Sequence, residues 1–318
     1  MTDVTRRTLT IMGLGVAGSL LVPGKLFGQA RRRVAFANIS DEIPFGATVL
    51  RGLKEAAANR KDFELTYMDN RNDAARALEN ARAVVAARHD LFIQYNAQAG
   101  SNLPIWRMMQ EAKIPVLAVQ IGVGEAPLFA VDNRASGTDS GKVLAETAKK
   151  KWPSETPVVV IIGIPEAGPF IAERASGAKE TIKRVSPSIE FIEFSSRNDA
   201  GHTRQLVTDT LTRFSGRKVL FWVHVDAMAL AALAAVRNAS RGADALITTT
   251  GGDRAAFPEI RVEGSPFLGT YAFFPELWGP DIIGAADDLL QGKQIAKLIH
   301  PRRQLFLSRD NIATYYPQ

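Results

Sequence analysis

The residues Val158-Val159-Val160-Ile161-Ile162 form an unbroken run of β-branched apolar side chains. Such a run is typical of a strand that is buried on both faces, as in a parallel sheet covered by helices on both sides. Toward the C-terminus, further apolar runs alternate with segments of helical periodicity. The pattern predicts helices at 170–184, 202–214 and 227–239, and strands at 189–194, 219–223 and 245–249.

The same alternation fills the chain before this run. It predicts strands at 34–37, 63–68, 91–95 and 115–119, and helices at 48–59, 74–88 and 103–112. Short strand-to-helix connections imply right-handed crossovers and a mostly parallel sheet. Two successive sets of similar size predict an α/β fold with two lobes. Because no Pro/Ser-rich linker separates the sets, we expect several close chain crossings between the lobes.

The composition is that of a globular protein: of 318 residues, 46% are hydrophobic and 23% charged, which excludes a disordered or fibrous chain. There is no cysteine, so disulfides, thiolate metal sites, a cysteine nucleophile and a lipid-anchored cysteine are all excluded. The net charge is +6, and leaving out residues 1–30, with three basic residues and one acidic residue, lowers it to +4. This small excess does not favour nucleic acid as a partner.

Residues 1–30 have the features of an export signal. Arg6-Arg7 precede a short apolar segment, and Gly28-Gln29-Ala30 provides the small residues that a signal peptidase requires. The paired arginines indicate the twin-arginine route, although Leu9 stands where that signal usually has Phe. We therefore expect a periplasmic protein without a lipid anchor.

The run Gly13-Leu14-Gly15-Val16-Ala17-Gly18 matches the dinucleotide-binding pattern GxGxxG. That pattern functions only when a helix begins directly after it and points its N-terminus at the pyrophosphate. Gly18, Pro23 and Gly24 would interrupt such a helix, so we attribute the glycines to the export signal and expect no nucleotide cofactor.

Ligands of open α/β sheets bind outside the carboxyl ends of the strands, so the loops there are the candidate site. They are rich in Asn, Gln, Asp, Phe and Gly, residues suited to hydrogen bonding and stacking. The loops are 39–46, 95–101, 120–125, 163–170, 195–199, 224–226 and 251–253.

Six short motifs in chain order resemble those of type I periplasmic binding proteins of the ribose/galactose kind, the solute receptors of ABC importers. The resemblance covers roughly residues 33–318. The motifs are Ile43-Pro44-Phe45, Asp69-Asn70-Arg71-Asn72-Asp73, Ala112-Lys113-Ile114-Pro115-Val116, Val131-Asp132-Asn133 with Gly137 and Gly141, Asp226-Ala227-Met228-Ala229-Leu230, and Leu289-Leu290-Gln291-Gly292-Lys293.

The resemblance implies two Rossmann-like lobes with parallel sheets, joined by a hinge of three crossings. It places residues 31–132 and about 275–300 in an N-terminal lobe, and 133–274 and about 301–318 in a C-terminal lobe. It also implies a monomer that closes by hinge motion on a small polar ligand, a sugar or sugar-like molecule, and delivers it to an ABC permease.

Several binding residues of the family are replaced. Gly46 stands for a second Phe, Gln120-Ile121 for the Asp-Arg pair that holds sugar hydroxyls, Val225 for an Asn and Phe273 for a Gln. The family's arginine at the start of the second lobe's first helix falls at Ala172, with Arg174 nearby. The usual pentose or hexose binding mode is therefore not expected.

We expect ligand contacts from side chains that combine stacking faces with hydrogen-bonding groups: Phe45, Asn96, Gln120, Phe170, His224, Asp226 and Phe273. Asp226 is also suited to cap a helix starting at Ala227. Asp132 and Asn133 are expected in the hinge, and Trp222 fits a buried strand.

No enzyme is expected, because HExxH, GxSxG and P-loop patterns are absent and the four histidines lack metal-site spacing. No metal or other cofactor is expected. A receptor of the same fold that signals to a membrane sensor kinase stays open as an alternative. A LacI-type regulator needs a DNA-binding module of about 50 residues before the first strand, where this chain has the export signal. An exported enzyme is the least supported alternative.

Overall fold

The structure, a computed structural model, describes residues 31–317. The export signal and the GxGxxG run that we predict lie outside the described residues. The described chain contains two six-stranded sheets.

The first sheet has the strand order β11-β5-β4-β3-β1-β2, and every neighbouring pair is parallel. β11 comes from far along the chain and pairs with β5 at one edge. The strands are β1 (Arg32–Asn38), β2 (Phe63–Asp69), β3 (Leu91–Gln94), β4 (Val116–Val119), β5 (Leu128–Phe129) and β11 (Leu298–Ile299).

The second sheet repeats this arrangement in the order β12-β10-β9-β8-β6-β7. Its pairs are parallel except for β10 with β12, which is antiparallel. The strands are β6 (Val158–Gly163), β7 (Phe191–Ser195), β8 (Val219–Val223), β9 (Ala245–Gly251), β10 (Phe267–Ala272) and β12 (Leu305–Ser308). The predicted α/β class with two mostly parallel sheets is confirmed.

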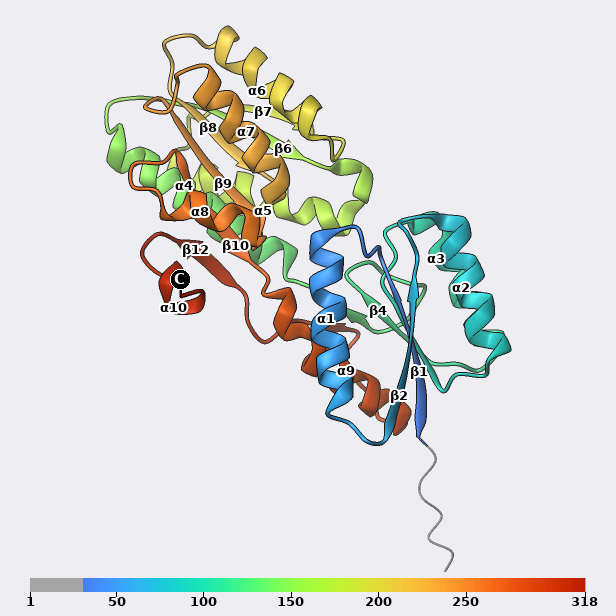
Figure 1. Cartoon of the computed structure of the whole chain (residues 1–318). Coiled ribbons are helices and arrows are strands. Elements are labelled where there is room, and N and C mark those ends of the chain that lie inside the picture. Colours follow the sequence, from blue (N-terminus) through green and yellow to red (C-terminus); the bar gives the residue numbers. More distant parts are fainter. Residues whose placement is uncertain (1–30, 318) are drawn as a thin grey trace, which may run out of the picture. The chain divides into compact units, whose positions relative to one another are not determined.

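Helices cover both faces of the first sheet because alternate strand residues face opposite sides. Val34 and Phe36 pack in a core with α1 (Pro44–Ala58) and α9 (Trp278–Leu290), which lie side by side in Figure 1. Ala35 and Ala37 face the opposite core, which is completed by α2 (Ala74–Ala86) and α3 (Ala99–Glu111). Both cores are apolar, so this sheet is buried on its two faces.

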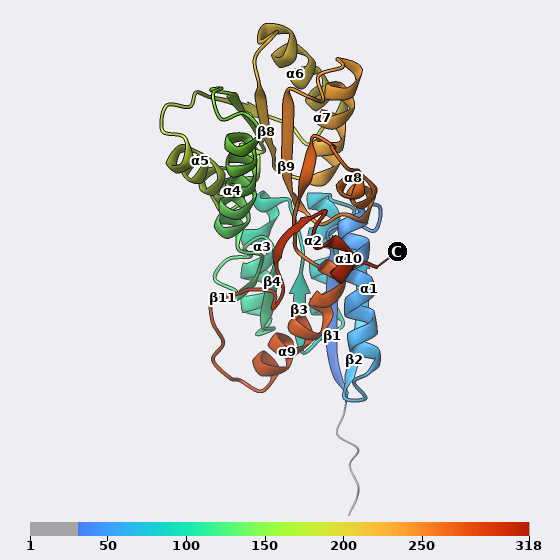
Figure 2. The ribbon, with the colours of Figure 1, turned by 90° about the vertical axis from the view of Figure 1, so that its left-hand side faces the viewer.

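The second sheet follows the same rule, and the run 158–162 is buried throughout. Val158, Val160 and Ile162 pack with α6 (Ala200–Arg213) and α7 (Asp226–Asn238). Val159 and Ile161 pack with α4 (Asn133–Lys151) and α5 (Pro169–Val185). Figure 2 shows α4 and α5 on one side of β8 and β9, with α6 and α7 on the other.

The remaining elements are short. They are the 3-10 turns η1 (Pro165–Ala167), η2 (Arg254–Ala256) and η3 (Pro275–Leu277), and the helices α8 (Phe257–Arg261) and α10 (Ile312–Tyr315). The long helix α1 begins at Pro44, four residues before the predicted start, because proline in the first turn loses no intrahelical hydrogen bond. α3 likewise begins at Ala99, whereas the pattern predicts a start at 103.

The chain passes between the two sheets three times: from β5 to α4, from β10 to α9, and from β11 to β12. The first and third crossings are tied together, since the Asp132 amide donates to Gln304 Oε1 at 2.9 Å. Near them, Ala130 N donates to Ile299 O at 2.9 Å. These bonds hold the connecting segments side by side.

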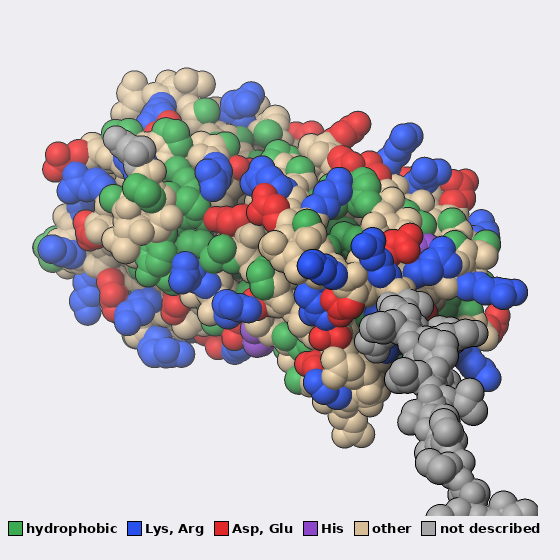
Figure 3. Space-filling model, turned by 60° about the horizontal axis from the view of Figure 1, so that its bottom comes forward, with side chains coloured by type: hydrophobic (Ala, Val, Ile, Leu, Met, Phe, Trp, Pro, Cys, Tyr) green, Lys and Arg blue, Asp and Glu red, His purple; other side chains and the backbone are tan. Residues whose placement is uncertain are grey.

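Figure 3 shows basic and acidic side chains interspersed over one face, rather than gathered by sign. Among the described residues, we find no helix with the length and apolar character needed to cross a bilayer.

Candidate ligand-binding site

The carboxyl ends of β3 and β4 each carry a buried glutamine with an unpaired amide nitrogen. Gln94 is fully buried, and its Oε1 accepts a hydrogen bond from Asn70 Nδ2 at 3.3 Å. Asn70 Nδ2 also donates to Tyr95 O at 3.0 Å, which fixes the orientation of its amide. Gln94 therefore turns Nε2 away from this chain of bonds, and that nitrogen has no partner among the described residues.

Gln120 is the second of these glutamines and directly follows β4. Its backbone is in the left-handed region, with φ at 64°, and its backbone N–H donates to Phe129 O at 2.8 Å. The side chain is 5% exposed, and Nε2 has no partner among the residues described. A glutamine held in an uncommon backbone conformation with an unused donor is suited to hold a ligand.

Asn96, in contrast, uses its side chain inside its own loop. Nδ2 donates to Ser101 Oγ at 2.8 Å and Asn102 Oδ1 at 2.7 Å, and Oδ1 accepts from Gln98 N at 3.0 Å. The residue is fully buried. The structure therefore places Asn96 as a support for the loop before α3.

Phe45 and Phe273 come from distant parts of the chain and meet where the crossing from β10 to α9 reaches the core of the first sheet. Their ring centroids lie 6.3 Å apart in an edge-to-face arrangement, and Phe45 makes a similar contact with Trp278 at 5.2 Å. Trp278 Nε1 donates to Phe273 O at 2.8 Å. Phe45 is partly exposed, whereas Phe273 is 3% exposed.

Arg174 is a side chain of the candidate site that the sequence analysis did not include among the expected ligand contacts. Its Nε donates to Asn133 Oδ1 at 2.6 Å, and Cζ lies 4.9 Å from the centre of the Phe273 ring. Burial lowers the pKa of Arg174 to about 10, although Tyr95 and Asp226 offset part of the effect. The available signal was the proximity of Arg174 to the expected family position; the structure brings Arg174 and not Ala172 to these partners.

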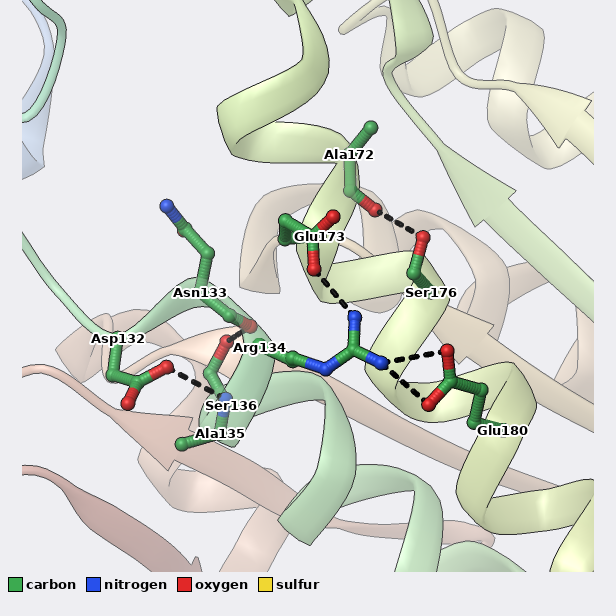
Figure 4. A network of polar contacts seen from close by, with 9 residues as sticks. All are labelled: Asp132, Asn133, Arg134, Ala135, Ser136, Ala172, Glu173, Ser176 and Glu180. Atoms are coloured by element: carbon green, nitrogen blue, oxygen red, sulfur yellow. Dashed lines mark hydrogen bonds and ion pairs between the residues drawn. The ribbon is translucent and has the colours of Figure 1, made fainter.

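The close packing of α4 and α5 positions Arg174. Gly137, Gly141 and Gly177 line the contact, and a Cβ on Gly137 would stand 1.8 Å from Arg174 O. At the outer edge, Arg134 binds Glu173 and Glu180 of α5 (Figure 4). Asp132 caps α4 by accepting from Ala135 N at 2.8 Å, also drawn in Figure 4. The helices thus hold Arg174 and Asn133 at a fixed spacing.

Asn133, which we expect in the hinge, also has an unpaired polar atom. It is 3% exposed, and its Oδ1 is used by Arg174. Nδ2 has no partner within the described chain. Asn133 therefore lies at the first crossing and, through its hydrogen bond with Arg174, also next to the candidate site.

His224 and Asp226 lie at the carboxyl end of β8 and are 4% and 1% exposed. Burial, and then the nearby Arg174 cation, lower the pKa of His224 to about 3, so the imidazole is neutral at neutral pH. Ser196 Oγ lies 2.8 Å from His224 Nε2. Asp226 Oδ2 accepts from Asp253 N at 2.6 Å, while Oδ1 has no partner among the described residues.

Burial raises the pKa of Asp226 to about 7, and the hydrogen bond from the Asp253 amide offsets only part of that rise. The expectation that Asp226 caps α7 is wrong, since Val225 is the N-cap and Asp226 is the first helical residue. The carboxylate instead reaches across to the loop after β9. A Cβ on Gly251 would stand 2.5 Å from Asp226 Oδ2, so glycine leaves room for this contact.

A cavity of about 240 Å³ lies between α5 and the strands β6 to β8. Trp222 forms part of its wall but is fully buried and donates to Ser140 Oγ at 2.8 Å, which agrees with a core role. Phe170 lies partly exposed in the first turn of α5, and the cavity is lined by its neighbour Ile171. The polar lining consists of Arg174, Ser176, Lys179, Glu193, Ser195 and His224.

The structure thus brings Phe45 together with Phe273. Arg174 contacts Asn133 and Phe273. It also lies close enough to Tyr95, His224 and Asp226 for their charges to interact. No group of three or more His, Asp or Glu residues within 31–317 is arranged to hold a metal ion. The side chains gathered here offer hydrogen-bonding groups, aromatic faces and the Arg174 cation.

A family model described as a periplasmic binding protein domain matches residues 34–294. The chain belongs to this family. The family predicted from the six sequence motifs is therefore confirmed, and with it the role of a solute-binding receptor. A curated relative is the ribose import binding protein RbsB of Bacillus subtilis (strain 168), 24% identical over 260 residues, or 80% of this chain and 81% of the relative.

Solved structures of ABC transporter solute-binding proteins share the fold. One from Mycobacterium smegmatis with bound glycerol has a TM-score of 0.79 at 18% identity, covering 91% of this chain and 98% of that one. One from Actinobacillus succinogenes 130z with bound D-allose has a TM-score of 0.78 at 18% identity, covering 90% of this chain and 100% of that one. One from Bacillus halodurans C-125 with bound myo-inositol has a TM-score of 0.76 at 20% identity, covering 91% and 98%.

Proposed function

We propose that this periplasmic binding protein captures a small polyhydroxylated solute outside the cytoplasm and delivers it to an ABC permease. Support comes from the family and from relatives whose names give ribose, D-allose, myo-inositol and glycerol as ligands. No chemical step is needed for this role, so we propose no enzymatic activity.

The observation that carries this proposal is a set of buried polar atoms without partners. Gln94 Nε2, Gln120 Nε2, Asn133 Nδ2 and Asp226 Oδ1 have none among the described residues. Each such atom costs about 1–3 kcal/mol when it stays unsatisfied. A polyhydroxylated ligand provides both donors and acceptors for them, and its carbon skeleton can pack against Phe45.

The proposed contact set therefore keeps Phe45, Gln120, His224, Asp226 and Phe273 from the sequence analysis. It adds three further polar side chains, and Phe170 is proposed at the rim. Asn96 is left out because its hydrogen bonds are used within its own loop. The added residues are Gln94, Asn133 and Arg174.

Two rigid lobes that turn about three crossings would close on this ligand. In this proposal residues 31–132 and about 275–300 move as one lobe, and 133–274 and about 301–318 as the other. Asp132 and Asn133 lie in the hinge. We propose a monomer that has no nucleic-acid partner, consistent with the mixed charges in Figure 3.

The test is a thermal unfolding screen of the purified protein with sugars, polyols, nucleosides and small acids. A ligand at 100 times its Kd stabilises the folded state by about 2.7 kcal/mol. For a chain of this size that raises Tm by roughly 5 °C. No shift with any sugar or polyol would contradict the proposal. Uptake that stops when the permease is deleted separates transport from signalling to a sensor kinase.

Export is proposed to use the twin-arginine signal in residues 1–30, without lipid attachment since the chain has no cysteine. Replacing Arg6 and Arg7 by Lys should leave precursor in the cytoplasm. Unchanged processing of that variant would favour the general secretory route instead.

A further inference from the structure

Arg174 is a cation at the candidate site, and no carboxylate of the described residues lies within ion-pair distance of it. Of its donors, only Nε finds an acceptor among the described residues, and that acceptor is the neutral amide oxygen Asn133 Oδ1. No ion pair within 4.0 Å joins Arg174 to any described acidic side chain. Arg174 is partly buried, and a guanidinium that has lost part of its contact with water is stabilised when an anion pairs with it.

The other charged groups near Arg174 supply only part of that counter-charge, and Asp226 is the one whose charge acts on Arg174. Lys179 Nζ lies 2.8 Å and 2.9 Å from the two carboxylate oxygens of Glu193, so these two neutralise each other. Asp226 uses Oδ2 to accept from Asp253 N. Burial raises its pKa to about 7, so a fraction of it is uncharged at neutral pH.

The other polar side chains around Arg174 are uncharged, so they do not neutralise its positive charge. His224 is neutral because burial lowers its pKa to about 3. Burial likewise raises the pKa of Tyr95, which stays a neutral phenol. On the first lobe, the two strand ends carry the amides Gln94 and Gln120. Arg174 therefore supplies positive charge, and the amide nitrogens of Gln94 and Gln120 offer unused donors on the first lobe.

We propose that the ligand is a polyhydroxylated carboxylate, a sugar acid, whose carboxylate pairs with the Arg174 guanidinium. This rests on the proposed receptor function and narrows its ligand class. The planar guanidinium presents parallel N–H donors that match a carboxylate in a two-point contact. The ligand hydroxyls bind the amides, and the skeleton packs near Phe45 and Phe273.

The test compares acids with uncharged analogues of the same carbon skeleton by calorimetric titration of the ligand-free protein. The pairs are D-gluconate with D-glucitol, D-galactonate with galactitol, and D-galacturonate with D-galactose. A hydrogen-bonded charge pair contributes enough that the acid should bind at least about tenfold more tightly in one pair. Arg174→Gln should remove that preference, and Arg174→Lys should restore part of it.

A matched control is Arg237→Gln on α7, whose side chain pairs with Glu259 at the surface. It should keep the acid preference. If the neutral member binds as tightly as the acid in every pair that binds, the sugar-acid inference is overturned while the receptor function stands. If neither acids nor neutral analogues bind, the sugar-acid inference is overturned, and the wider thermal unfolding screen decides whether the proposed function stands. The wild-type comparison decides the matter even if Arg174→Gln does not fold.

Discussion

Gly137 in α4 allows a direct test of how the site is built. A Cβ at this position would stand 1.8 Å from Arg174 O and 2.7 Å from Arg174 C, whereas ordinary contacts begin at 3.4 Å. The neighbouring atoms belong to the backbone of α5, so no side chain can rotate away. Gly137→Ala therefore forces the two helices apart where Arg174 is held.

The expected cost follows from two opposing effects. Alanine in a helix interior is more favourable than glycine by about 0.5–1 kcal/mol. Overpacking a tight contact costs about 1–3 kcal/mol, and a clash with backbone falls at the upper end. The free energy of unfolding of Gly137→Ala should therefore fall by about 2 kcal/mol. Ligand affinity should fall as well, because the bond from Arg174 Nε to Asn133 Oδ1 is stretched.

Gly284→Ala is the matched control, since Gly284 also lies inside a helix, α9, but a Cβ there meets no atom within 4 Å. This variant should gain about 0.5–1 kcal/mol. Urea unfolding of both variants and the wild type gives the two changes. If Gly137→Ala is as stable as Gly284→Ala, the tight packing of α4 on α5 does not hold in solution and the account of how Arg174 is positioned fails.

Three further outcomes are expected. The pKa of Asp226 is raised in the folded state to about 7, so the protonated side chain stabilises the folded protein fully below about pH 4. This stabilisation declines as the pH rises and is lost above 7. Asp226→Asn should flatten that decline in urea midpoints measured from about pH 4 to 8. His224 has the opposite sign, because its folded pKa is lowered to about 3; acid destabilises the protein below about pH 6.5, and His224→Asn should reduce this loss in the same titration. Gln304→Ala removes the acceptor of the Asp132 amide between two crossings and should cost about 1 kcal/mol in urea unfolding, whereas Gln205→Ala, which loses only an exposed bond to Asp209, should change little.

The alternation of strands and helices was predictable because apolar periodicity is a local property of the chain. The run 158–162 is buried on both faces as its composition indicates. Neither α4 nor the elements after residue 250 were predicted. Among the latter, a strand as short as Leu298–Ile299 is stabilised by pairing with β5 and not by its own sequence.

The site was less predictable because it depends on which face of each element meets another. Asn96 and Gln94 are both amides at the end of β3, yet only the hydrogen-bond chain through Asn70 shows which one keeps a free nitrogen. Arg174 could be placed on a helix from the sequence. The direction in which its side chain points follows from the close packing of α4 and α5 at their glycines, which no local sequence pattern reveals.

The helix α9 has a consequence for the order of folding. Trp278, Ile282 and Ile283 complete the core between α1 and the first sheet, although they follow the whole second sheet except β12. A nascent chain that ends before residue 278 would cover this face of β1 and β3 with α1 alone, without the part of the core that α9 provides. The first lobe can therefore reach its final core only after nearly all of the chain has been synthesised, and until then its apolar face is a surface for chaperones or aggregation.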